Sequence, residues 1–276
     1  ACCRGEQDTG RHKANLATYT QDRRAYEHWS DGDFNQSNRL MGEYHKHAAS
    51  YLCPNGCGNT AKMTADHIGP ISLGFAHRPK FNALCNSCNS TKNNRMSLSD
   101  VQQLIQDEQA GEQVVSWHSK PIWDALKGLV ESNQDAVKLS RLMATNMQQV
   151  LPILAEVYEQ TGSEYLTRYL RPEYAFQDHR FTGFHPLEPE KLVTITKPLD
   201  SKNKQKNAER YVRISFEELE RFTSKTNRRV KSSTSDEVER EVTEVVAAVK
   251  AGLNEKADSH LLRALTILAE QAKHSW

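Results

Sequence analysis

The sequence predicts an α+β fold that is mainly helical, with a small cysteine-rich unit embedded in it and a small β-hairpin near the C-terminus. Three observations predict this arrangement. Apolar residues recur at helical spacing over most of the chain. Residues 52–96 break that pattern and are rich in Cys, Asn and Gly. Residues 191–197 and 210–215 are two short runs typical of strands.

These changes in pattern divide the chain into four parts. Residues 1–51 are expected to be an N-terminal helical segment, and residues 52–98 the embedded unit. Residues 99–185 are expected to be helical, and residues 186–276 to hold a basic β-hairpin followed by C-terminal helices.

Start and stop signals place the individual helices. Ser97 or Ser99 can cap a helix that runs through Val101, Leu104 and Ile105. Further helices are expected at residues 120–132, 134–160, 163–170, 235–251 and 256–273. A proline inside a helix removes one backbone donor, so Pro152 predicts a bend.

The C-terminal hairpin is expected to carry positive charge. Residues 172–190 hold several prolines and aromatic residues and are expected to form an ordered loop or a linker. The connection between the two predicted strands, residues 198–209, contains Lys202, Lys204 and Lys206. Such a loop is a candidate for DNA contact, and a solvated hairpin tip is the alternative.

Composition narrows the possible classes of protein but does not identify the function. The net charge is +1, yet residues 197–231 contain eleven Lys and Arg against five Asp and Glu, so a nearly neutral chain can still present a basic face. No long apolar run or signal peptide is evident, which favours a cytoplasmic protein. Because the chain begins with Ala1 rather than Met, we also allow for upstream sequence.

Four of the six cysteines form two close pairs. Cys53 and Cys57 flank a Pro-Asn-Gly turn, and Cys85 and Cys88 have CxxC spacing. Four thiolates arranged as two pairs suit a tetrahedral structural zinc, and four buried structural thiols are the alternative. A zinc site alone would also suit a ribbon that only binds DNA or protein.

The residues between and beside these pairs have the chemistry that phosphodiester hydrolysis needs. His67 can act as a general base near neutral pH. Asp66 and Asn89 offer hard oxygen ligands for Mg²⁺ or Mn²⁺. Neighbours on a strand point to opposite faces, so Asp66 and His67 reach one site only if the strand is bent.

Each of these residues also has a simpler interpretation. An Asp-His pair is common in solvated turns, Asn82 can be a strand-edge residue, and Asn89 a helix N-cap. It is their joint position within the four-cysteine frame that favours catalysis.

That joint pattern resembles the HNH, or ββα-metal, endonucleases, and especially the subclass whose zinc is held by flanking cysteine pairs. The resemblance implies a zinc-stapled ββα-metal nuclease module at residues 52–98, with His67 as general base. It also implies that Asp66 and Asn89 bind one catalytic divalent cation, and that Asn82 supports the loop and orients His67. Many HNH members have His where this chain has Asn89.

The stretches 66–75 and 92–96 are also similar to type IIS restriction endonucleases of the HNH class, over about residues 50–100. This implies a Mg²⁺-dependent enzyme that cuts double-stranded DNA, with a homodimer as one way to cut both strands. A homing or junction-resolving HNH nuclease is the alternative enzyme. A non-catalytic zinc-stapled DNA-binding module is the alternative from another class.

Several cations near this unit are candidates for contacts with DNA phosphates. Arg78 and Lys80 lie between Asp66 and Asn82 in the sequence, and Lys92 and Arg95 follow Asn89. A solvated face explains each of them equally well.

Overall fold

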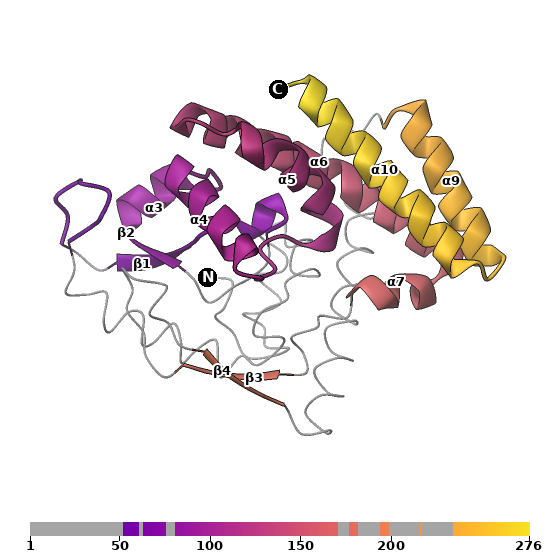
Figure 1. The fold of residues 1–276 in the computed structure, drawn as a ribbon, viewed down its shortest axis with the longest axis horizontal. Helices are drawn as coiled ribbons and strands as arrows, with labels where there is room; N and C mark the ends of the chain where they lie inside the picture. The colour runs from indigo at the N-terminus through magenta and orange to yellow at the C-terminus, as the bar shows by residue number, and fades with distance from the viewer. Residues whose placement is uncertain are drawn as a thin grey trace.

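The structure is a computed structural model that describes residues 52–60, 63–75, 81–170, 177–181, 194–198, 216 and 234–276. Within these residues the protein is mostly helical, with small antiparallel sheets (Figure 1). The N-terminal helices expected before residue 52 lie outside the described residues, as does most of the segment 199–233. No described helix is long and apolar enough to cross a membrane.

The helices agree closely with the sequence prediction. They are α3 (Asn86–Lys92), α4 (Leu98–Gln109), α5 (Lys120–Leu126), α6 (Asn133–Thr161), α7 (Ser163–Leu170), α9 (Asp236–Lys250) and α10 (Asn254–His274). Short 3-10 turns lie at Ile71–Leu73, Trp117–Ser119 and Lys127–Leu129.

The caps explain where several of these helices begin and end. Ser97 is the N-cap of α4, and its hydroxyl and the Asp100 carboxylate satisfy each other's backbone N–H groups in a capping box. Helix α6 continues through Pro152. The helix expected at 120–132 is shorter than predicted, because α5 gives way to a 3-10 turn that contains Gly128, a weak helix former.

Two apolar clusters hold the helices together. The first joins α6, α7, α9 and α10 through the buried residues Val150, Leu154, Leu166, Val245, Leu261 and Leu265, among others. The second joins α4, α5 and α6 to the segment after β1 through Ile68, Leu73, Phe75, Leu104, Trp123 and Leu139, among others. Figure 1 shows α9 and α10 side by side, with α10 running alongside α5 and α6.

A two-stranded sheet precedes α3. Strand β1 (Met63–His67) pairs antiparallel with β2 (Phe81–Cys85), from Met63 opposite Cys85 to His67 opposite Phe81. Helix α3 follows β2 directly, so residues 63–92 form two strands and a helix in that order. The sequence predicted this small unit within residues 52–98.

Close packing fixes the unit to the helical body. After His67 the chain turns at Gly69, whose φ of +83° is a left-handed conformation that favours glycine. A Cβ at Gly69 would lie 2.9 Å from Cγ of Phe75 and 3.0 Å from Cδ2 of Leu104. The turn therefore seats the end of β1 against α4.

The second sheet differs from the prediction. Strand β4 (Thr194–Pro198) confirms a strand over part of 191–197, but its described partner is β3 (Gln177–Phe181). Residues 177–181 were expected to be loop or linker, and that expectation was wrong. Their polar sequence lacks the alternation typical of strands, so their extended conformation depends on pairing with β4. The second predicted strand, 210–215, and the lysine loop lie outside the described residues.

Candidate metal centre and active site

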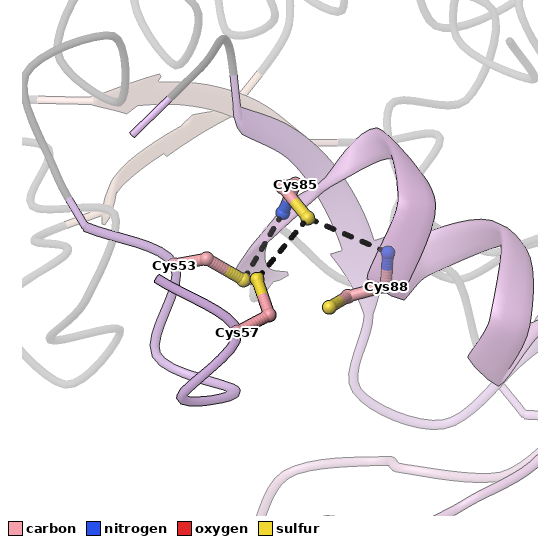
Figure 2. Close-up of side chains that lie close together, drawn as sticks. All are labelled: Cys53, Cys57, Cys85 and Cys88. Atoms are coloured by element: carbon pink, nitrogen blue, oxygen red, sulfur yellow. Dashed lines mark hydrogen bonds between the residues drawn. The ribbon is translucent and has the colours of Figure 1, made fainter. Parts of the chain in front are cut away.

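The four predicted cysteines meet in space. The Sγ atoms of Cys53, Cys57, Cys85 and Cys88 all lie within 4.8 Å of one another (Figure 2). The Sγ atoms of Cys57 and Cys85 are 3.7 Å apart. Four sulfurs at zinc–sulfur distances of about 2.3 Å from one tetrahedral ion would be about 3.8 Å apart. The cluster therefore fits a zinc ion in both ligand type and spacing.

The local backbone directs N–H groups toward these sulfurs. The amide of Cys85 donates to Sγ of Cys53 at 3.4 Å, and the amide of Cys88 donates to Sγ of Cys85 at 3.5 Å. The side-chain amide of Asn55 donates to Sγ of Cys88 at 3.3 Å. Gly56 and Gly58, with φ of +69° and +72°, allow the tight turn between Cys53 and Cys57. Such donors stabilise thiolate charge and orient metal ligands.

Proximity makes the thiols differ in acidity. The N–H of Cys88 lowers the pKa of Cys85 to about 7. Asn55 favours the thiolate of Cys88, but the sulfurs of Cys57 and Cys85 outweigh it and raise the Cys88 pKa to about 12. Neighbouring sulfurs therefore resist full ionisation together, and a bound cation would remove this conflict.

The strand register gathers polar residues on one face of the small sheet. Thr64 lies opposite Leu84, and Asp66 opposite Asn82. Because side chains alternate along a strand, Thr64 and Asp66 share a face, and directly opposed residues lie on the same side of the sheet. Asp66 is buried.

Helix α3 contributes Asn89 to this face. The side-chain nitrogen of Asn89 donates to the hydroxyl of Thr64 at 2.8 Å, and that hydroxyl donates to the carbonyl oxygen of Leu84 at 2.9 Å. These bonds tie α3 to both strands. With the nitrogen of Asn89 engaged, its Oδ1 is the atom suited to a cation.

Lys92, one helical turn after Asn89, joins two carboxylates. Its Nζ forms a short ion pair with Oδ2 of Asp66 and lies 2.8 Å from Oδ2 of Asp100. The Oδ1 atom of Asp100 accepts a hydrogen bond from Nδ2 of Asn82 at 2.8 Å. Because Asn82 is opposite Asp66 on the sheet, the four residues Asp66, Lys92, Asp100 and Asn82 form a closed set, which we call the polar ring.

Burial and charge work against each other in the polar ring. Burial raises the pKa of Asp66 above its usual value, and the attraction of Lys92 offsets this only in part. Burial favours the neutral amine of Lys92, but the charges of Asp100 and Asp66 outweigh it and raise the pKa of Lys92. Lys92 is therefore a partly buried cation, with its side chain 16% exposed.

His67 is the last residue of β1 and is partly exposed. The pairing is regular through Asp66 and His67, so alternation directs their side chains to opposite faces of the strand. The bend at Gly69 follows His67. The bend that would bring Asp66 and His67 to one side is therefore not found within the described strand, and His67 lies at the end where the chain leaves the sheet.

The remaining candidates for DNA contact differ in their surroundings. Arg95 is exposed, and its guanidinium donates to the backbone oxygens of Thr91 and Lys92 near the end of α3. Five candidates lie outside the described residues: Arg78, Lys80, Lys202, Lys204 and Lys206.

Sequence reasoning missed Thr64 and Asp100 as parts of this site. The sequence offered a sign of Asp100 only as the fourth residue of the motif Ser97-Leu98-Ser99-Asp100, which indicates a helix cap. Its contacts with Lys92 and Asn82 depend on how α4 packs against the sheet.

Comparison with known proteins identifies the family. A family model described as Type II restriction endonuclease (RE_Alw26IDE) matches residues 1–269. No curated protein matches the chain, and no solved structure does. The match covers nearly the whole sequence, including the cysteine cluster and the polar ring. The chain therefore belongs to this family of type II restriction endonucleases, enzymes that cut DNA.

Proposed function

We propose that this protein is a zinc-stapled HNH endonuclease that cuts double-stranded DNA with Mg²⁺, in the manner of a type IIS restriction enzyme. The observation that carries the proposal is the unit of two strands and a helix, in which Asp66 on β1 and Asn89 on α3 share one face beside four clustered thiols. Family membership supports DNA as the substrate.

Asp66 and Asn89 are the proposed ligands of the catalytic cation. A carboxylate and an amide oxygen are the donors that Mg²⁺ and Mn²⁺ prefer. Lys92 contacts Oδ2 of Asp66, which leaves Oδ1 for a cation, and the bond to Thr64 leaves Oδ1 of Asn89. A bound divalent cation would polarise the scissile phosphate and stabilise charge on the leaving oxygen.

His67 is the proposed general base. A neutral imidazole nitrogen accepts the proton of the attacking water. In an in-line displacement the nucleophile and the leaving oxygen lie on opposite sides of phosphorus, so the base and the group that stabilises the leaving oxygen are needed on opposite sides. His67 is partly exposed at the end of β1, where solvent water can reach it, and this supports its role as the base.

The cysteine cluster is proposed to hold zinc as a structural element. Cys85 lies where β2 meets α3. Cys53 and Cys57 belong to the loop that precedes β1, and the cluster holds this loop against Cys85. Zinc would therefore fix the distance between the strand that carries Asp66 and the helix that carries Asn89. Asn82 is proposed to support this arrangement through its bond to Asp100.

A decisive experiment compares plasmid cleavage by matched variants of the full chain. We expect Asp66→Asn, His67→Ala and Asn89→Ala each to lower the cleavage rate by about a hundredfold or more. Asn86→Ala, which alters an exposed residue in the first turn of the same helix, should cut like the wild type. Zinc content and circular dichroism would establish that each variant is folded.

Mapping the cuts on sequenced plasmid tests the restriction assignment. Cuts at a fixed distance from one asymmetric sequence support a type IIS enzyme, and a preference for branched DNA supports a resolving nuclease instead. Wild-type protein that cuts no DNA form with Mg²⁺ or Mn²⁺ would falsify the enzyme proposal. The expected homodimer and the DNA contacts of Arg78, Lys80, Arg95, Lys202, Lys204 and Lys206 are parts of the proposal that binding measurements would test.

A further inference from the structure

The polar ring extends beyond the two strands and the helix of the proposed nuclease centre. Asp66 and Asn82 belong to the paired strands and Lys92 to α3, but Asp100 comes from α4. Asp100 is also part of the cap of α4, and its side chain is 3% exposed. A buried carboxylate on the helical body is thus in contact with the centre's own lysine.

We propose that Lys92 and Asp100 are positioning residues that hold Asp66 in the orientation needed to bind the catalytic cation. This inference rests on the proposed function, because it assigns Asp66 as a cation ligand. Lys92 contacts Oδ2 of Asp66 and turns Oδ1 toward the cation. Asp100 holds the ammonium of Lys92 in place.

Several contacts hold the carboxylate of Asp100 in a fixed position. Its Oδ2 accepts a hydrogen bond from the backbone N–H of Ser97 at 2.9 Å and lies 2.8 Å from Nζ of Lys92. Its Oδ1 accepts from Asn82 at 2.8 Å. Both oxygens are therefore fixed before Lys92 reaches Asp66. A lysine side chain has many rotamers, and this contact selects one.

The position of Lys92 argues against a direct role in binding DNA phosphates. Its ammonium lies between two carboxylates, and its side chain is 16% exposed. Arg95, three residues later, is exposed and has no carboxylate contact among the described residues. The two cations on one short segment thus offer a matched comparison.

Charge alone and positioning predict different results. If only charge mattered, removal of the Lys92 cation would strengthen divalent cation binding, and removal of the Asp100 anion would weaken it. If both residues position Asp66, each removal weakens binding. For removal of the Lys92 cation, the two explanations predict opposite changes in affinity for the divalent cation, so one measurement separates them.

The experiment measures Mn²⁺ binding to the zinc-loaded full chain by electron paramagnetic resonance, without DNA. We expect Lys92→Met and Asp100→Asn each to weaken Mn²⁺ binding by about tenfold, as is typical when a residue that supports a metal ligand is lost. The double variant should bind about as weakly as either single variant, because both changes break one chain of contacts. Lys92→Arg, which keeps charge and donors, should restore much of the affinity.

Two variants serve as controls. Ser97→Ala weakens the cap of α4 but leaves the Asp100 carboxylate, so it should lower thermal stability without changing Mn²⁺ affinity. Arg95→Met removes a cation from the same segment and should also leave the affinity unchanged.

Three results would overturn the inference. Tighter Mn²⁺ binding by Lys92→Met would mean that the ammonium competes with the cation, and unchanged binding would mean that the polar ring only stabilises the fold. The third result concerns the folded, zinc-loaded wild-type protein. If it bound no Mn²⁺, and if it also cut DNA without any added divalent cation, then the proposed cation site would be wrong and this inference would be wrong with it.

Discussion

The small unit at residues 52–96 and the helical body after it are held together in different ways. Helix α3 buries none of its residues, whereas α6 buries twelve, most of them apolar. In the small unit the main connections are the cysteine cluster, the Thr64–Asn89 contact and the polar ring. In the body they are two apolar clusters, the second of which also includes Ile68, Leu73 and Phe75 of the small unit.

The difference follows from size and function. A segment of this length cannot bury enough apolar surface to be stable, so metal ions commonly replace a core in such units. Apolar contacts are also non-directional, whereas metal–sulfur bonds and charged hydrogen bonds fix atoms in particular positions. The part that has to place Asp66 and Asn89 accurately is held by directional bonds.

Zinc removal tests this comparison most strongly. Structural zinc in small domains contributes about 10 kcal/mol or more of folding free energy. We expect a chelator, or Cys88→Ser, to abolish DNA cleavage and to unfold β1, β2 and α3, while α9 and α10 stay folded. Hydrogen exchange followed by mass spectrometry would show fast exchange at 63–92 and protection at 254–274. Equal loss of protection in both regions would contradict the comparison.

A core substitution in the body is the converse test. Leu265 in α10 is 2% exposed, and Leu265→Ala should lower the free energy of unfolding by about 2–5 kcal/mol. Leu262→Ala, on the same helix at 59% exposure, should change it by less than about 0.5 kcal/mol. Urea denaturation measures both. Zinc affinity should be the same in each folded variant, and a large change would show that the two regions are coupled.

The cap of α4 lies where the two regions meet. Loss of the Ser97 hydroxyl should cost about 1 kcal/mol in the free energy of unfolding. Ser90→Ala, at an exposed position on α3, is the control and should have little effect. Thermal denaturation would show the difference, and equal melting temperatures for the two variants would mean that the cap contributes nothing.

A partly buried contact of the body, between His260 and Glu241, should show the smallest effect. His260 lies 2.6 Å from a carboxylate oxygen of Glu241, and this contact lowers the Glu241 pKa below its ordinary value of 4.5. A depressed pKa stabilises the folded state above pH 4.5, and this stability is lost as the pH falls through the folded value.

Glu241→Gln should therefore destabilise the protein by about 0.5 kcal/mol at neutral pH, as for other pairs near the surface. The difference from wild type should vanish in acid. Glu244→Gln, at a more exposed glutamate of the same helix, should show a smaller change. A difference that grows toward low pH would contradict the assigned direction.

Much of the fold and of the site could be predicted because their signals are local. Cysteine spacing indicated the cluster, and capping residues such as Ser97 indicated helix starts. Asp66 and Asn89 could be selected because they lie within that frame. Residues 177–181 were missed because their strand forms by pairing with a distant segment. Asp100 was missed because its partners are 18 residues away or belong to another element.

Cys85 belongs to three structures at once, being the last residue of β2, the N-cap of α3 and part of the cysteine cluster. This makes it a fixed point from which positions along the chain are counted. One residue inserted between Asn82 and Cys85 would turn Asn82 to the other face of the sheet. One inserted between Cys88 and Lys92 would rotate Lys92 about 100° around the helix axis. Members of the family that keep this centre are therefore expected to vary in length outside residues 82–92.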